Sequence, residues 1–109
     1  MYRSGYAGDK REPIVASPIA ALELTWLKES GRFNPEPAQA LGWLARTLGL
    51  TMDDTPFASV TAEAAGPAYA FTRDPFDRLI AANAGAAGVP LLTRDRRLRK
   101  HLDFAVWPS

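Results

Sequence analysis

One stretch, residues 72–95, constrains the fold of this chain more than any other, because it specifies a helix and the strand after it. Asp74 and Pro75 form a pair that is typical of an N-cap and the first position of a helix. Gly88 suits the end of that helix, since glycine adopts a left-handed conformation without strain. The apolar residues 89–93 then predict a strand that is buried on both faces. This order of elements indicates an α/β fold.

Carboxylates stand at both ends of this helix–strand unit. Asp77 lies in the first turn of the expected helix, and Asp95 follows the expected strand. Ligands bind at the C-terminal edge of parallel strands, so both side chains are expected near that edge. A third acid, Glu23, lies within the apolar stripe of an earlier helix, where a carboxylate is costly without a partner. Converging carboxylates need a cation, and oxygen ligands suit Mg²⁺ or Mn²⁺.

Each of these acids also has a structural explanation. Asp74 and Asp77 suit the capping of one helix, and Asp95 suits the capping of the next. Glu23 can reach solvent along its own stem. Thr93 could position a ligand, although a threonine in a strand more often only packs. The residues by themselves therefore leave a structural and a functional interpretation open at every one of these positions.

The rest of the chain alternates short apolar runs with helical patterns. We expect strands at residues 14–16 and 104–107, and helices at residues 19–29, 38–48, 58–65 and 96–101. Short strands that alternate with helices predict an α/β domain with a mostly parallel sheet, here over residues 13–109. Residues 1–12 lack apolar periodicity and are expected to form an irregular N-terminal arm.

Composition narrows the classes of partner. The net charge is only +1, but residues 94–100 hold five cations against one carboxylate, a local charge of +4. This basic run comprises Arg94, Arg96, Arg97, Arg99 and Lys100. It suits a phosphate backbone, with a solvated helix face as the alternative. The absence of cysteine excludes disulfides and thiolate metal sites. No apolar run could span a bilayer or serve as a signal peptide, so we expect a cytoplasmic protein without a membrane partner.

The remaining conspicuous side chains have ordinary interpretations. Trp26, Trp43, Trp107 and Phe33 are expected in the core or in a dimer contact. His101 is expected at the surface, because the chain has no cysteine and no second histidine to complete a metal site with it.

Two segments match known sequence signatures. The first is VASPIAALELTWLKESGRF, and the second is RDPFDRLIAANAGAAGVPLLTRDRRLRKH. Both resemble the signatures of PIN domains of the VapC toxin type, and the second is the more specific of the two. The C-terminal VWPS is similar to the last strand of that family, so the resemblance runs from about Ile14 to Ser109. It implies a three-layer α/β fold in which helices flank the sheet.

The resemblance also implies an activity. Proteins of this type are metal-dependent endoribonucleases, usually the toxin of a toxin–antitoxin pair, which implies an RNA substrate, an antitoxin protein and often a homodimer. They gather about four acids around Mg²⁺ or Mn²⁺. Glu23, Asp77 and Asp95 match three of these acids, so they are the expected catalytic and metal-binding residues. Asp74 matches no ligand and is an outer helper or only the helix cap, while the basic run is expected to hold the RNA.

The sequence departs from the family pattern at its N-terminus. The family begins with an apolar strand that ends in an aspartate and is normally central in the sheet, and no segment here matches it. The fold expected from the resemblance is therefore PIN-like without its N-terminal strand. Two interpretations follow. The chain is an active ribonuclease with three of the four acids, or it is an inactive module or truncated fragment that binds antitoxin or RNA without cleaving.

Overall fold

A computed structural model describes residues 2–3 and 14–107 of the chain, and these residues form an α/β domain with a five-stranded sheet. The strand order is β3-β2-β1-β4-β5. The strands are β1 Tyr2–Arg3, β2 Ile14–Ala16, β3 Thr51–Met52, β4 Leu91–Leu92 and β5 Ala105–Val106. The pairs β2–β3 and β4–β5 are parallel, whereas β1 runs antiparallel to both β2 and β4. The expected α/β class is confirmed, with a mixed sheet that is parallel only on either side of its central strand.

The centre of the sheet corrects the expectation for the N-terminus. Tyr2 pairs with Val15 on one side and with Leu91 on the other, so β1 occupies the position between β2 and β4. The prediction of an irregular arm was therefore wrong for Tyr2 and Arg3. The antiparallel β1 is nevertheless not the apolar strand ending in an aspartate with which the family pattern begins. Strands β2 and β4 each present backbone groups that need partners, and even a short extended segment can satisfy them. The rest of the predicted arm lies outside the described residues.

The helices begin and end close to where the sequence predicts. They are α1 Pro18–Glu29, α2 Pro37–Leu48, α3 Phe57–Ala64, the short 3₁₀ helix η1 Pro67–Tyr69, α4 Pro75–Ala87 and α5 Arg96–His101. Ser17 caps α1, with its hydroxyl oxygen accepting from the Ile19 backbone N at 3.2 Å. Gly49 and Gly88 end α2 and α4 in the left-handed conformation, at φ values of 71° and 72°. These signals act within a few residues, which is why the sequence sufficed to locate them.

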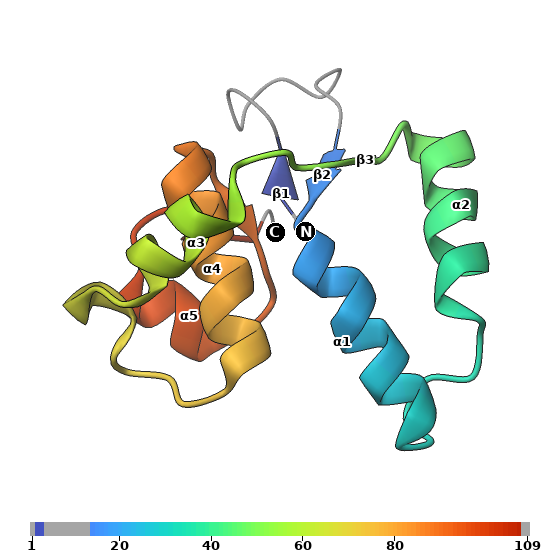
Figure 1. Cartoon of the computed structure of the whole chain (residues 1–109), viewed down its shortest axis with the longest axis horizontal. Helices are drawn as coiled ribbons and strands as arrows, with labels where there is room; N and C mark the ends of the chain where they lie inside the picture. The colour runs from blue at the N-terminus through green and yellow to red at the C-terminus, as the bar shows by residue number, and fades with distance from the viewer. Residues whose placement is uncertain (1, 4–13, 108–109) are drawn as a thin grey trace.

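The core is built around α4. Ala81, Ala82 and Ala84 on this helix are fully buried, and α3 packs along it. The small alanine side chains allow α3 and the sheet to approach α4 closely. Tyr69 is also buried, and its hydroxyl donates to Glu63 Oε2 at 2.7 Å. In Figure 1, α3, α4 and α5 gather on one side of the molecule, whereas α1 and α2 stand on the other.

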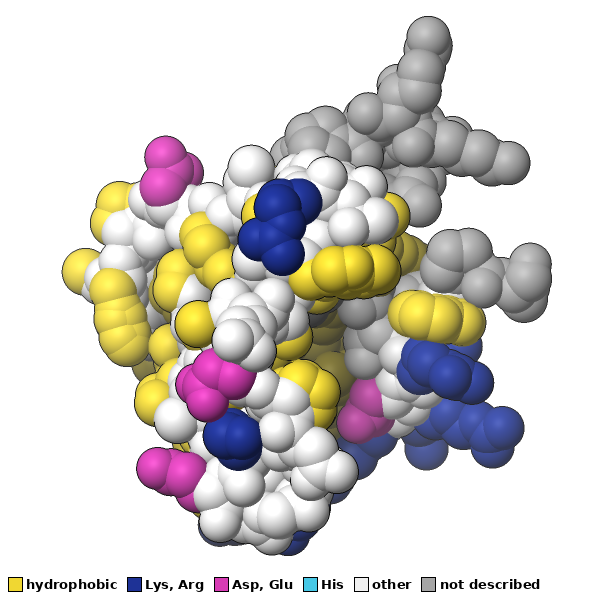
Figure 2. All heavy atoms as spheres, turned by 90° about the vertical axis from the view of Figure 1, so that its right-hand side faces the viewer, with side chains coloured by type: hydrophobic (Ala, Val, Ile, Leu, Met, Phe, Trp, Pro, Cys, Tyr) yellow, Lys and Arg dark blue, Asp and Glu magenta, His cyan; other side chains and the backbone are white. Residues whose placement is uncertain are grey.

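The tryptophans are not in the core, contrary to one of the two expectations for them. Trp26, Trp43 and Trp107 keep 43%, 55% and 45% of their surface exposed. Figure 2, which views the molecule from the α2 side, shows hydrophobic side chains spread over the surface among charged ones. The expected dimer contact remains a prediction. In the described part of the chain, no helix has the length and apolar character needed to cross a membrane.

Candidate active site

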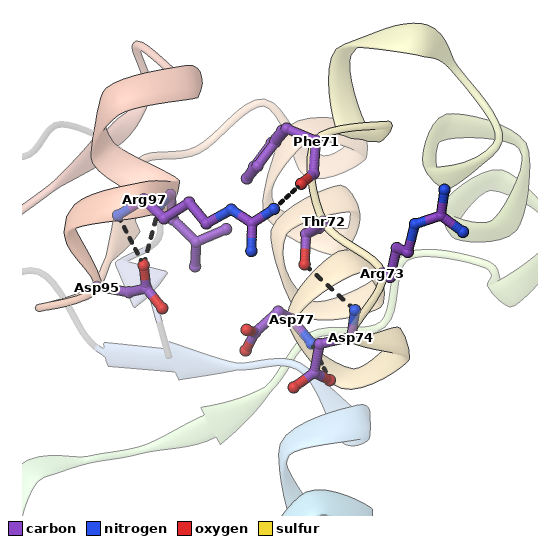
Figure 3. A pocket seen from close by; sticks show the side chains of 8 residues that line it. Phe71, Thr72, Arg73, Asp74, Asp77, Asp95 and Arg97 are labelled. Carbon is purple, nitrogen blue, oxygen red and sulfur yellow. Dashed lines mark hydrogen bonds between the residues drawn. The ribbon is translucent and has the colours of Figure 1, made fainter.

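A pocket of about 360 Å³ lies where α4 and α5 begin, beyond the C-terminal end of β4 (Figure 3). Its lining is strongly charged, with three carboxylates and two arginines. The residues that line it are Phe71, Thr72, Arg73, Asp74, Asp77, Asp95, Arg97 and Leu98. The pocket thus stands at the strand edge where the sequence predicted Asp77 and Asp95 to converge.

The start of α4 fixes two of these acids. Asp74 Oδ1 accepts from the backbone N of Phe76 at 2.9 Å and from that of Asp77 at 3.3 Å, so Asp74 is the N-cap. The buried hydroxyl of Thr72 in turn accepts from the Asp74 backbone N at 3.3 Å. These bonds hold the first turn of α4 in place, and Asp77 on that turn lines the pocket.

Asp95 caps α5 and lines the same pocket. Its Oδ1 accepts from the backbone N of Arg97 at 2.8 Å and from that of Leu98 at 3.1 Å. Both bonds end on Oδ1, so Asp95 caps α5 without using Oδ2. Oδ2 is therefore available to a ligand while Oδ1 serves as the cap. The Thr93 hydroxyl accepts from the Asp95 backbone N at 3.1 Å, which assigns this threonine to the turn after β4.

Glu23 approaches from α1 through a smaller adjoining pocket. This second pocket, of about 130 Å³, is lined by Glu23, Asp77 and Thr93 together with apolar residues of α4, β4 and α5. Because Asp77 lines both pockets, it links the acid on α1 to the acid that follows β4. The structure therefore brings the three acids predicted from the sequence into one continuous region, with Asp77 at its centre.

The charges in this region act on one another. The pKa of Asp77 is raised by burial, then by the nearby charges of Asp74 and Asp95, and is lowered by Arg97. The pKa of Glu23 is raised by burial and then by the charges of Asp77 and Asp74. Electrostatic repulsion therefore acts on Asp77 from Asp74 and Asp95, and on Glu23 from Asp77 and Asp74. Their ionised forms would be stabilised by a cation, and their oxygen atoms are the ligands that Mg²⁺ and Mn²⁺ favour.

The acids nevertheless do not form a closed metal cage. Among residues 2–3 and 14–107, no three Asp, Glu or His side chains lie close enough together to hold a metal ion. The chemistry of the donors therefore fits a divalent cation, although no three of them in the described part of the chain lie close enough together to enclose one.

The basic run does not act as one uniform surface. Arg97 reaches across the pocket and donates from Nη2 to the Phe71 carbonyl oxygen. Arg99 turns back and donates to the Arg94 carbonyl oxygen at 3.2 Å. The Arg94 guanidinium lies 5.6 Å from the centre of the Trp107 ring, a cation–π contact. The five cations predicted to hold RNA thus have different neighbours, and their roles need separate tests.

The remaining cations of α5 and its histidine are at the surface. Arg96 and Lys100 are exposed, which leaves their charges free for a polyanion. His101 is also exposed and stacks on Phe71, with ring centroids 4.3 Å apart, as the interpretation of a surface histidine predicted.

Two exposed tryptophans contact sequence neighbours of the candidate acids, although we expected both in the core or in a dimer contact. The ring centroids of Trp26 on α1 and Phe76 on α4 are 5.8 Å apart, and Phe76 precedes Asp77 in the sequence. The Arg32 guanidinium lies 5.0 Å from the centre of the Trp26 ring. The Trp107 ring, which follows β5, makes a similar cation–π contact with the Arg94 guanidinium. The signal that could have found Trp107 is its position after an expected parallel strand, where ligands commonly bind.

Comparison with known proteins places these residues in context. The sequence matches the PIN domain family over residues 4–102. It is also 38% identical over 96 residues to Ribonuclease VapC22 of Mycobacterium tuberculosis, an alignment that covers 83% of this chain and 68% of that protein. No solved structure matches the chain. The matched region contains the acids of both pockets and the basic run.

Proposed function

Because this chain belongs to the PIN domain family and is a toxin of the VapC type, we propose that it is an endoribonuclease that hydrolyses RNA phosphodiester bonds. The observation that carries the proposal is the convergence of Glu23, Asp77 and Asp95 on two adjoining pockets. These acids come from α1, from α4 and from the residue after β4, so only the folded chain brings them together.

In this proposal Glu23, Asp77 and Asp95 hold a divalent cation, Mg²⁺ or Mn²⁺. When bound, such a cation stabilises the negative charge that develops on a phosphate group while a nucleophile attacks its phosphorus atom. Asp74 adds negative charge nearby while it caps α4, so it supports the site without being a ligand. Burial raises the pKa of Glu23 and of Asp77 most, and repulsion from neighbouring carboxylates raises both further. A cation would relieve that repulsion, which supports this arrangement.

The RNA backbone lies along the basic run in this proposal. Arg94, Arg96, Arg97, Arg99 and Lys100 supply the charge, and Arg97 stands closest to the acids because it lines their pocket. Contacts between cations and phosphates do not distinguish one base from another. Because these contacts release counterions, the affinity for RNA should fall steeply as the salt concentration rises. The half-exposed Trp107 ring beside Arg94 is suited to stack on a base.

An antitoxin protein and a second copy of the chain are the proposed protein partners. A groove of about 570 Å³ between α1 and α2 has a mostly apolar lining that includes Leu24, Leu41 and Trp43, and Glu23 also lines it. An antitoxin that inserts an amphipathic helix there would bury these side chains. The further exposed apolar residues Met52 and Phe57 are candidates for a homodimer contact.

The second candidate function is an inactive binding module, which keeps the fold and binds antitoxin or RNA without cleaving. Two observations favour it. In the described part of the chain no three acids form a metal-binding group. The central strand, moreover, is the antiparallel β1 in place of an apolar strand that ends in an aspartate.

Cleavage of a mixed RNA substrate with Mn²⁺, with Mg²⁺ and with a chelator tests the proposal. Asp77→Asn removes the acid that links the two pockets and should lower the rate by about a hundredfold or more. Asp103→Asn is the matched control, because Asp103 is exposed and lines neither pocket. Cleavage that survives both the chelator and Asp77→Asn would exclude the metal-dependent mechanism. RNA binding without any cleavage would favour the inactive module.

A further inference from the structure

Arg97 differs from the other cations of the basic run in the direction of its side chain. Two arginines line the acidic pocket, Arg73 and Arg97. In Figure 3 the Arg73 guanidinium turns away from the carboxylates, whereas the Arg97 side chain extends from α5 across the pocket. The positive charge inside the pocket therefore comes from Arg97, although both arginines belong to its wall.

Two hydrogen bonds at its opposite ends set the position of Arg97. Its backbone N donates to Asp95 Oδ1 at 2.8 Å, and its Nη2 donates to the Phe71 carbonyl oxygen. The side chain thus bridges the start of α5 and the segment that leads into α4. A guanidinium has five N–H donors, so the bond to Phe71 leaves others for anions in the pocket.

The electrostatics of Asp77 agree with this geometry. Burial raises the pKa of Asp77 most, the charges of Asp74 and Asp95 raise it further, and Arg97 is the group that lowers it. Arg97 therefore offsets part of the repulsion among the carboxylates. A divalent cation in the same pocket would be attracted by the acids and repelled by this guanidinium.

We propose that Arg97 is an internal counter-cation of the acidic pocket, which opposes the binding of a divalent cation there and presents the same charge to an RNA phosphate. The RNA part rests on the proposed ribonuclease function, whereas the cation part does not. The two effects have opposite signs. Loss of the Arg97 charge should strengthen the binding of the metal and weaken the binding of RNA.

The neighbouring Arg96 supplies a matched control. It carries the same charge on the same turn of α5, but it does not line either acidic pocket. Arg96→Gln should therefore weaken RNA binding through the loss of one phosphate contact and leave metal affinity near that of the wild type. Arg97→Lys supplies the complementary control, because it keeps the charge and alters the hydrogen-bonding geometry.

The experiment is calorimetric titration of the whole chain with Mn²⁺ alone, for the wild type and the three variants. Arg97→Gln should bind Mn²⁺ about three- to tenfold more tightly at low salt, while Arg97→Lys and Arg96→Gln stay close to the wild type. The gain should shrink as salt rises, because counterions screen a partly exposed charge. A purely structural role of Arg97 would not produce this salt dependence.

Fluorescence anisotropy with a labelled single-stranded RNA, in the presence of chelator, completes the test. Arg97→Gln and Arg96→Gln should both bind the RNA more weakly than the wild type. Thermal melting of each variant shows whether the fold is intact, and Arg97→Met, which keeps the apolar stem, replaces Arg97→Gln if the latter unfolds.

Unchanged or weaker Mn²⁺ binding in Arg97→Gln, or in Arg97→Met where it replaces that variant, would overturn the role of Arg97, and so would the absence of Mn²⁺ binding in every protein tested. These results are distinguishable from failure of the ribonuclease proposal. Tighter Mn²⁺ binding in Arg97→Gln without RNA cleavage by the wild type would support the counter-cation and refute the ribonuclease. RNA cleavage by the wild type, together with equal Mn²⁺ affinity in the wild type and in Arg97→Gln, would support the ribonuclease and refute the counter-cation.

Discussion

The two groups of helices differ in how firmly they are packed. On α4, residues 81–84 are all buried, and Leu91 of the adjacent β4 is also buried. In contrast, α1 has no buried residue, and α2 buries only Pro37. Asp77 and Asp95 belong to the well-packed group, whereas Glu23 is on the exposed α1. The candidate site is thus assembled from two acids held near a core and one acid on a helix with an open apolar face.

This contrast explains how acids can be near one another without forming a cage. Capping bonds at the starts of α4 and α5 fix the backbone beside Asp77 and Asp95. Because α1 has no fully buried residue, a small movement that brought Glu23 towards a cation would disturb less packing than a movement of α4 would. The apolar groove between α1 and α2 lies on the same side of the molecule, so a partner that filled it would also stabilise the helix that carries Glu23.

The largest expected effect comes from truncating a large side chain in each group. Leu91→Ala should lower the free energy of unfolding by about 2–5 kcal/mol, because it leaves a cavity beside α4. Trp43→Ala should lower it by about 1 kcal/mol or less, since that ring is 55% exposed on α2. Urea denaturation measures both. Similar losses in the two variants would show that α2 is as firmly packed as α4, for example through a dimer contact.

A glycine in each group gives the next effect. A Cβ at Gly85 on α4 would clash with Tyr69 Oη and lie 3.0 Å from Glu63 Oε2, so Gly85→Ala should cost about 1–3 kcal/mol. A Cβ at Gly42 on α2 meets only the mobile end of Arg46, at 3.2 Å. Gly42→Ala should therefore stabilise the protein by about 0.5–1 kcal/mol. Chemical denaturation of the two variants sharpens the comparison, and a destabilised Gly42→Ala would contradict it.

The smallest effect is the pH dependence that the two pockets create. The folded-state pKa values of Glu23 and Asp77 are raised above their ordinary values of 4.5 and 3.8, so the folded protein binds these protons more readily than the unfolded chain. Their contribution to the stability of the fold is therefore present below the ordinary pKa values and is lost as the pH rises to the raised folded-state values. Asp77→Asn and Glu23→Gln should melt at a higher temperature than the wild type at pH 7 and lose this advantage at pH 3.

Thermal melting at the two pH values, with Asp103→Asn as the exposed control, measures this effect. Addition of Mn²⁺ should then raise the melting temperature of the wild type more than that of either variant, because both variants lose a ligand. Variants that melt below the wild type at pH 7 without metal would show that the carboxylates make stabilising contacts, and the repulsion inferred between the pockets would be wrong.

Much of the fold was predictable because its signals are local. Asp74 and Asp95 were expected as helix caps, and the structure shows the side chain of each accepting from backbone N atoms two or three residues ahead. Gly88 ends α4 where its freedom to adopt a positive φ predicts. The carboxylates of the candidate site were found for the same reason, since Asp77 and Asp95 occupy fixed positions relative to these caps.

The errors concern contacts between residues that are distant in the sequence. Nothing within Tyr2 and Arg3 shows that they lie between Val15 and Leu91, because strand pairing depends on the partners that the rest of the sheet leaves open. Apolar character likewise predicted burial for Trp43, but burial depends on whether another element covers the ring, and none does so fully on α2.

The sequence by itself thus determined where helices begin and end and which acids stand at the edge of the sheet, because capping and left-handed turns involve only neighbouring residues. The tertiary structure alone decided three features: the central position of β1, the exposure of the α1 and α2 faces, and the direction of Arg97 across the pocket. Each depends on atoms brought together by folding from separate parts of the chain, and the packing of those parts cannot be read from any single segment.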